Sequence, residues 1–309
     1  MNIALILFQL AIIVAGPIYM IGIINRVKSL WAGRRGPRLN QSWFDLLRLL
    51  RKTPVYSVVT SWIFPLAPIV ILASTVTASL FVPLVPGFAL YSFTGDFVAF
   101  LYLLGLGKVF LMLGALDTGS AFEGMGASRE ATYAALAEPV IMLTLGTLIL
   151  ASGHMSFNDL VIPQTDTVTS ISIRIALAAV MFIVLLIETS RVPADDPTTH
   201  LELTMVHEVM ILDHSGPELA IVQYAAGIKM VLLAGLISAL LNPFSFHQLP
   251  LLAMFVSLAL IALVAVLVGL TESLTARLRF RAIPLFTFAA FLISMICLVL
   301  VHSSQGTVQ

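Results

Sequence analysis

The chain has 309 residues, of which 59% are hydrophobic and 10% charged, and its formal net charge at pH 7 is zero. Its mean hydropathy of +1.03 exceeds what a soluble core of this length can bury. This excludes a water-soluble globular protein and predicts an all-α, polytopic membrane protein; the neutral charge also weighs against a nucleic-acid partner. The single cysteine, Cys297, excludes internal disulfides and a four-thiolate iron–sulfur cluster on this chain, so redox centres are expected on partners.

Eight apolar runs predict membrane-spanning helices, approximately at residues 3–24, 62–83, 97–116, 131–151, 172–190, 219–241, 250–270 and 283–301. At a rise of about 1.5 Å per residue, each crosses a hydrocarbon core of roughly 30 Å. The first run has no A-x-A-like cleavage site, so we expect a retained helix and not a signal peptide. The sequence shows no inverted repeat and no flexible linker, which favours a single domain over residues 1–309.

Basic residues gather on one side of these spans. The loops 25–61, 117–130, 191–218 and 271–282 hold thirteen of the sixteen Lys and Arg residues. The other three lie within spans, and the opposite loops have none. The positive-inside rule therefore predicts that this side is cytoplasmic, with both termini outside, in the cell inner membrane.

The first basic loop predicts an interfacial amphipathic helix. Its apolar residues recur at helical spacing and its charged residues take the other face: Trp43, Leu46, Leu47 and Leu50 against Asp45, Arg48, Arg51 and Lys52. A helix lying on anionic lipid and a docking surface for a peripheral subunit both fit, and the two are compatible. Before it, the turn at Gly36-Pro37 leaves Arg34 and Arg35 facing an anionic partner or carboxylates of the bundle.

Besides Arg174 near the start of the fifth span, four charged residues lie inside the predicted spans, where charge is costly enough that each is a candidate site. Lys108 is near the middle of the third span, and Lys229 lies roughly 15 Å into the sixth. Glu138, about 10 Å below the end of the fourth span, precedes Pro139, and Glu188 closes the fifth. These groups can meet only in the bundle interior. Both a fixed salt bridge and a proton or ion path fit, and we favour the path because static buried bridges are often dispensable.

The second basic loop, DTGSAFEGMGASREA, carries the carboxylates of Asp117, Glu123 and Glu130. Ser128 is a suitable N-cap for the fourth span, which would begin near residue 131. Solvated surface acids are the simplest interpretation. Their expected position above Glu138 makes them candidates for the same path.

The stretch from Glu188 to Pro217 is unusually acidic and, with Glu218, holds seven of the sixteen acidic residues. Pro193 and Pro197 predict an extended segment around residues 191–198. Thr199 and Glu202 predict a capping box that starts a helix ending near Asp213. Glu202, Glu208 and Asp213 would lie at the membrane surface, where some are expected to be protonated or linked by water.

Three histidines, His200, His207 and His214, recur every seven residues in this stretch. Seven helical residues separate them by about 10.5 Å, whereas the ligands of one metal converge within about 2 Å of it. We therefore expect no metal site here. A hydrogen-bonding or pH-sensitive role is an alternative for His207.

Several segments together resemble the membrane-anchor subunit of energy-converting nickel–iron hydrogenases, the family of the fourth subunit of formate hydrogenlyase and component C of hydrogenase-4. They are GRRGPRLNQSWFDLLRLLRK, ALDTGSAFEGMGASREATYAALAEP, E-x-x-R-x-P-x-D with a later LEL and DHSG, and ESLTARLRF. The family is similar in turn to subunit 1 of respiratory complex I. The resemblance implies a subunit without a redox centre, joining a peripheral nickel–iron and iron–sulfur arm to antiporter-like pumping subunits.

The resemblance assigns residues by position. Arg129 and Glu138 match a family arginine and glutamate nine apart, and Lys229 matches a family lysine. Further matches are Glu188, Arg191, Pro193, Asp195 and Glu202, whereas Asp213 stands at a family glutamate and Lys108 at a family arginine. Ala194 replaces a family phenylalanine, residues 196–200 replace an acidic run, and about three residues are added before Asp213. Because this region lines the quinone cavity in complex I, these departures weigh against a quinone site.

The resulting hypothesis is a membrane subunit that docks a hydrogenase-type arm and couples its redox reaction to proton or sodium translocation. The path residues would be Glu138, Glu188, Glu202, Asp213, Glu130, Glu208, Asp117, Lys108 and Lys229. The docking and loop residues would be Arg34, Arg35, Arg129, Arg191, Asp195, Asp196, Glu272 and Arg277. Expected partners are the hydrogenase large and small subunits, an iron–sulfur subunit, antiporter-like membrane subunits and the lipid bilayer. A quinone-site subunit of complex I and a stand-alone ion transporter are the alternatives.

Overall fold

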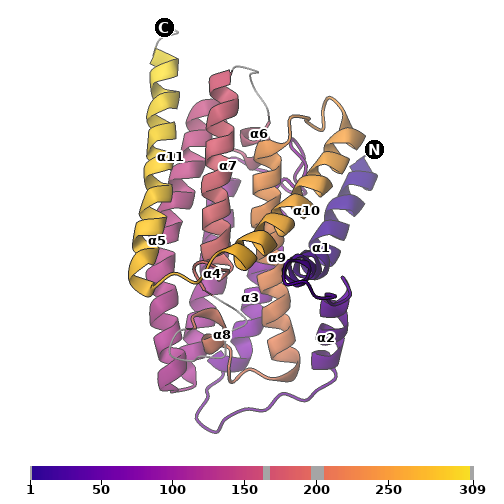
Figure 1. Cartoon of the computed structure of the whole chain (residues 1–309), viewed down its shortest axis with the longest axis vertical. Coiled ribbons are helices and arrows are strands. Elements are labelled where there is room, and N and C mark those ends of the chain that lie inside the picture. The colour runs from indigo at the N-terminus through magenta and orange to yellow at the C-terminus, as the bar shows by residue number, and fades with distance from the viewer. Residues whose placement is uncertain (1, 163–167, 196–204, 307–309) are drawn as a thin grey trace.

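The computed structural model describes residues 2–162, 168–195 and 205–306. Among these residues, seven helices are long and apolar enough to cross a membrane, and a 17-residue apolar helix stands beside them. The eight are α1 (Asn2–Trp31), α3 (Ile63–Ser79), α4 (Asp96–Asp117), α5 (Ala121–Ser152), α7 (Val168–Glu188), α9 (Gly216–Leu241), α10 (Pro250–Leu274) and α11 (Ile283–Gly306). The predicted polytopic, all-α architecture is confirmed, and Figure 1 shows the helices as an upright bundle crossed obliquely by α10.

Helix α9 is the axis of the bundle. It packs against α1, α3, α7 and α10, and 78% of its most apolar window is buried, against 28–44% for the other long helices. The outer helices associate in pairs, α3 with α4, α5 with α11, and α1 with α10. Residues on α9 are therefore the ones best placed to reach several helices at once.

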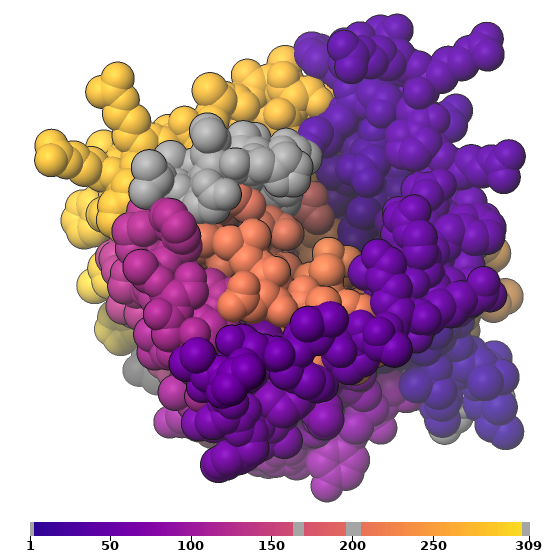
Figure 2. Space-filling model, turned by 90° about the horizontal axis from the view of Figure 1, so that it is seen from below, coloured from indigo at the N-terminus to yellow at the C-terminus, as the bar shows by residue number. Residues whose placement is uncertain are grey.

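Short elements close the end of the bundle toward which the basic loops project, and we call this the basic end. They are α2 (Gln41–Leu50), α8 (His207–Met210) and the 3-10 turn η1 (Phe280–Ala282); α6 (Phe157–Leu160) is the remaining short helix. Figure 2 views this end. The orange residues 205–213, which contain α8 and which we call the α8 segment, are recessed there between the purple 50–62 segment and the magenta start of α5. The predicted amphipathic helix is confirmed as α2, which packs beside α1 and α9.

Two predicted boundaries are wrong. Helix α5 begins at Ala121, after an extended Ser120, so Ser128 is not its N-cap, and Glu123 and Glu130 are helical residues and not loop residues. The two glycines in this first part of α5 weaken the sequence signal for a helix. One of them is needed there, because a Cβ on Gly126 would lie 2.4 Å from Val209 of the α8 segment.

The prediction of a helix that ends near Asp213 is also wrong for the part of it that lies in the described residues. Between Met205 and Asp213 the only helix is the four-residue α8, whereas Thr199 and Glu202, the expected capping box, lie outside the described residues. Side chains from elsewhere in the chain hold this segment. Because they satisfy its backbone groups, it has no need to be helical.

Candidate functional site

A chain of ion pairs crosses the middle of the bundle and joins four helices. Glu188, at the end of α7, accepts hydrogen bonds from Lys108 on α4 (2.8 Å) and pairs with Lys229 on α9 (3.5 Å). Lys108 also contacts Glu138 on α5, at 3.3 Å. The order Lys229–Glu188–Lys108–Glu138 therefore alternates in charge from the central helix to the outer surface.

The inner members of this series of ion pairs and its outer end at Glu138 differ in environment. The side chains of Lys108 and Glu188 are 5% and 4% exposed, whereas that of Glu138 is 51% exposed. Charged groups in a membrane-spanning bundle are stable only when paired or hydrated, and Lys108 and Glu188 meet that requirement within the chain. Glu138 instead opens onto a lateral groove of about 370 Å³ lined by α4, α5 and α7 residues, including Tyr102, Gly105 and Met142.

Glu130 lies beside this chain of pairs without joining it. The residue is buried, and its Oε2 atom has no hydrogen-bond partner among the described residues. One turn further along α5, the buried hydroxyl of Tyr133 also lacks a partner in the described part of the chain, and its ring stacks on Phe280. This part of α5 thus carries two buried side-chain oxygens without a hydrogen-bond partner among the described residues.

Asp195 is the anchor of the α8 segment. Its carboxylate, 1% exposed, pairs with Arg277 at 2.9 Å and accepts the backbone N–H groups of Val206 (2.9 Å) and His207 (3.3 Å). Arg129 donates to the carbonyl of Met205 at 2.9 Å. Side chains from three separate parts of the sequence therefore set the position of His207.

A second internal ion cluster ties the ends of α1, α7 and α10 together. Glu272, whose side chain is fully buried, contacts Lys28 at 2.7 Å and Arg191 at 3.2 Å. Two cations share one carboxylate here, which lowers the cost of burying all three. The cluster holds the turn after α7 against α1 and α10.

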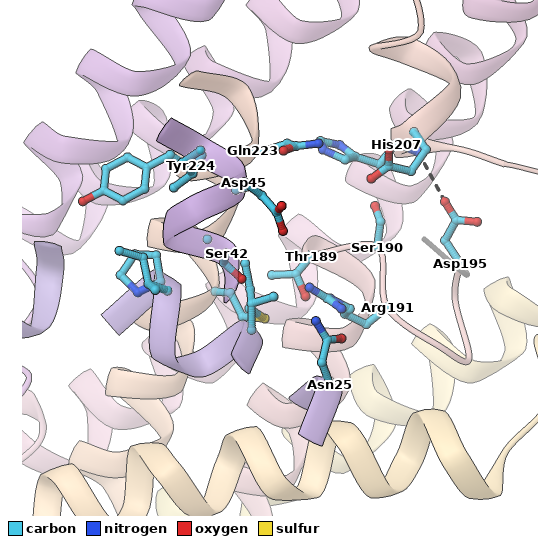
Figure 3. Close-up of a pocket in the computed structure, with 18 residues that line it drawn as sticks. Asn25, Ser42, Asp45, Thr189, Ser190, Arg191, Asp195, His207, Gln223 and Tyr224 are labelled. Atoms are coloured by element: carbon cyan, nitrogen blue, oxygen red, sulfur yellow. Dashed lines mark hydrogen bonds between the residues drawn. The ribbon is translucent and has the colours of Figure 1, made fainter. Parts of the chain in front are cut away.

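The main cavity of the basic end, about 270 Å³, lies between α1, α2, α8, α9 and the turn that follows α7. Figure 3 shows Asp45, Arg191, His207 and Gln223 directed into this space from four different segments. The other lining residues include apolar ones such as Ile18 and Met230, so the cavity is amphipathic. Such a cavity suits a ligand with a polar head and an apolar body, or water molecules next to an apolar surface.

His207 lies between this cavity and the central ion pairs. It lines the main cavity and also a smaller one of about 40 Å³ that Lys108 and Lys229 line. Burial, with the positive charges of Lys229 and Arg191, lowers the pKa of His207 to about 4. The imidazole is therefore neutral at pH 7 and can accept or donate a hydrogen bond without adding charge.

A third group of contacts closes the end of the α8 segment. The Tyr56 hydroxyl donates to Glu218, whose other oxygen contacts His214 at 3.3 Å, and Phe64 stacks on the His214 ring at a centroid distance of 4.1 Å. The hydrogen bond to Glu218 raises the pKa of Tyr56, and burial lowers that of His214. This cluster fastens the 53–62 segment to the start of α9.

The structure brings together only part of the predicted path. Lys108, Lys229, Glu138 and Glu188 form the ion-pair chain, Glu130 lies beside it, and Glu208 lines the main cavity. Asp117 instead accepts the Ser61 N–H, and Asp213 is an exposed residue whose N–H is held by Glu123. Glu202 and Asp196 lie outside the described residues.

The predicted docking residues also fall into two groups. Arg34 and Arg35 are exposed, whereas Asp195 and Glu272 are enclosed in the chain's own ion pairs with Arg277 and Arg191. Lys28 and the Tyr56–His214–Glu218 cluster were not predicted. The partners of Lys28 and Tyr56 lie far away in the sequence, so no local pattern indicates those contacts, whereas the i,i+4 spacing of His214 and Glu218 is a local signal for theirs.

Comparison with known proteins gives consistent matches over almost the whole chain. A family model described as NADH dehydrogenase matches residues 2–303. Hydrogenase-4 component C and formate hydrogenlyase subunit 4 of Escherichia coli (strain K12) are 31% and 28% identical over 300 residues, with 93% of each chain covered. A chain of the membrane-bound sulfane sulfur reductase, an archaeal respiratory membrane complex, shares the fold: the TM-score is 0.81 at 19% identity, covering 96% of this chain and 99% of that one.

Proposed function

Because the chain belongs to the NADH dehydrogenase family, we propose that it is the membrane subunit through which an energy-converting hydrogenase, or a hydrogenase-related complex, couples its redox reaction to ion translocation. Its relatives hydrogenase-4 component C and formate hydrogenlyase subunit 4, matched nearly end to end, support membership of a multi-subunit membrane complex. In this proposal the nickel–iron site and the iron–sulfur clusters belong to partner subunits. The ion translocated is a proton or sodium.

The observation that carries the coupling role is the ion-pair chain Lys229–Glu188–Lys108–Glu138. Each inner group has two partners of opposite charge, so a charge change at one end alters the pairing of the next group. One end approaches His207 and the main cavity, and the other opens at Glu138 on the lateral groove. Such an arrangement can pass an electrostatic change across the bundle without moving a redox centre into it.

The basic end offers a surface for the peripheral arm. Arg34 and Arg35 are exposed, and so are the apolar side chains of Val55, Val58 and Trp62 in the segment that crosses the end of the bundle. Contacts at both ends of this segment hold it in place: Val55 N–H donates to Ser215 and Ser61 N–H donates to Asp117. Exposed apolar side chains on a fixed segment, next to exposed arginines, suit a water-soluble partner. The contact surface of that partner would be apolar at its centre and acidic at its edge. We propose that this end faces the cytoplasm.

The lateral groove suits a neighbouring membrane subunit. A half-exposed carboxylate in a spanning helix is costly against lipid, so a protein surface over Glu138 is favoured. Antiporter-like subunits are the partners that we propose here.

The Glu138→Gln variant tests the coupling role. In inverted membrane vesicles, redox-driven ion uptake should be lost, because the amide cannot carry the charge that ends the ion-pair chain. The same vesicles should keep redox activity and full subunit composition, both measured on the purified complex. Ion uptake at the wild-type rate in Glu138→Gln would rule out this role, and loss of assembly would show that Glu138 acts in docking.

A second candidate function, quinone binding, is favoured by the amphipathic main cavity. Its volume of about 270 Å³ is close to the lower limit of ligand pockets, which start at about 300 Å³, so a ring would fit but not a long tail. Quinone-dependent turnover that falls on replacing Ile18 by Trp would support this function. Turnover that is independent of added quinone would exclude it.

A further inference from the structure

The charges at the centre of the bundle do not balance. Two lysines, Lys108 and Lys229, face three carboxylates, Glu130, Glu138 and Glu188. If all five were ionised, the group would carry one uncompensated negative charge. Both lysines already contact Glu188, and Lys108 also contacts Glu138, so Glu130 is the one of these carboxylates that has no ion pair among the described residues.

The surroundings of Glu130 are those of a neutral acid. It is 5% exposed, and its Oε2 atom has no hydrogen-bond partner within the described residues. The charges that act most strongly on it are those of Lys229 on α9, Lys108 on α4, Glu188 on α7 and Asp195 before α8. Asp195 is neutralised by Arg277. An ionised carboxylate buried without a partner is strongly disfavoured, and such a group usually takes up a proton instead.

We propose that Glu130 holds a proton in the resting protein and that this proton is the exchangeable proton of the central ion cluster. The protonation follows from the charge count and the burial alone. Its role in translocation rests on the proposed coupling function and adds to it the residue from which the proton leaves.

The geometry also indicates the cation that would release this proton. Within the described residues Lys229 has one carboxylate partner, Glu188, at 3.5 Å, which is the longest of the three contacts in the series of ion pairs. Lys229 also lines the small cavity together with His207. A change of partner from Glu188 to Glu130 would favour the ionised form of Glu130. The O–H bond of Glu130 would then break, the electron pair would stay on the carboxylate, and the proton would pass to a water molecule that reaches Glu130.

Infrared spectroscopy of the full chain in detergent tests the resting state. Wild type minus Glu130→Gln should show the carbonyl band of one protonated carboxylic acid that shifts in heavy water. Glu272→Gln is the matched control: Glu272 is equally buried but has two cationic partners, so its removal should remove no such band. Gln has the shape of the neutral acid, so Glu130→Gln should also keep the wild-type melting temperature. An unchanged carboxylic-acid band or a misfolded Glu130→Gln protein would overturn the proposal.

Glu188→Gln provides an independent test on a residue other than Glu130. Removing Glu188 leaves two lysines facing two carboxylates, so Glu130 should ionise and its carboxylic-acid band should disappear. A band that persists in Glu188→Gln would contradict the charge count. Neither measurement depends on translocation. If the band behaves as expected while Glu138→Gln vesicles still take up ions, the coupling function fails and the protonation of Glu130 stands.

Discussion

At the scale of single residues, burial decides how much each ion pair contributes to stability. Two aspartates with nearly equal ion-pair distances show this. Asp195 pairs with Arg277 at 2.9 Å and is 1% exposed as a side chain, whereas Asp45 pairs with Arg48 at 2.7 Å and is 42% exposed. Asp195→Ala should lower the free energy of unfolding by about 3–5 kcal/mol because it removes a buried carboxylate that pairs with a partly buried arginine and accepts two backbone N–H groups. Asp45→Ala should cost roughly 0–1 kcal/mol. Thermal unfolding in detergent compares them, and equal losses would contradict this account.

His207 makes a separate prediction about pH. Its folded-state pKa of about 4 lies below the usual 6.5, so the unfolded chain binds the proton more tightly. The contribution of His207 to stability is complete above about pH 6.5 and is lost as the pH falls toward 4. Melting temperatures measured across this range should fall less steeply in His207→Gln than in wild type. His154→Gln, which changes an exposed histidine, should keep the wild-type slope. Parallel slopes for all three proteins would show that His207 is not responsible.

At the scale of secondary-structure elements, the contact between α5 and α8 depends on one glycine. A Cβ on Gly126 would lie 2.4 Å from Val209 Cγ1 and 3.1 Å from the Val206 carbonyl, whereas one on Gly124 would meet nothing within 4 Å. Gly126→Ala should push the α8 segment outward and cost about 1–3 kcal/mol. Gly124→Ala should stabilise α5 by about 1 kcal/mol through helix propensity alone. Unfolding in detergent, with proteolysis of residues 205–213 as a second readout, separates the two. A stabilised Gly126→Ala protein would refute the close approach.

The lateral groove makes a prediction at the scale of the whole molecule, since it concerns how the chain joins a complex. Gly105 lines the groove and Gly146 does not, and a Cβ on either would meet nothing within 4 Å. Gly105→Leu should leave the chain folded but reduce co-purification of the neighbouring membrane subunit at least several-fold, because it fills the contact surface. Gly146→Leu should leave co-purification unchanged. Mass spectrometry of complexes purified through a tag on this chain measures both. An intact complex with Gly105→Leu would place the partner elsewhere.

The sequence by itself determined the fold class, the eight apolar helices and the family. Hydrocarbon thickness sets a minimum length for an apolar run, and the cost of charge in lipid marks Lys108, Glu138, Glu188 and Lys229 as groups that must meet inside. The resemblance drawn from the ordered motifs is confirmed by the family match and by the two Escherichia coli relatives. These inferences depend on local composition, which a single sequence displays.

Only the tertiary structure decided which charges pair and which do not. The rotation of each helix about its axis makes Glu188 the partner of both lysines and leaves Glu138 half exposed. It also leaves Glu130 without an ion pair in the described part of the chain. The short α8 has the same origin, because Asp195 and Glu123 take backbone groups that a longer helix would have paired internally. Such contacts join residues far apart along the chain, and their energies depend on burial, which exists only once the helices have packed.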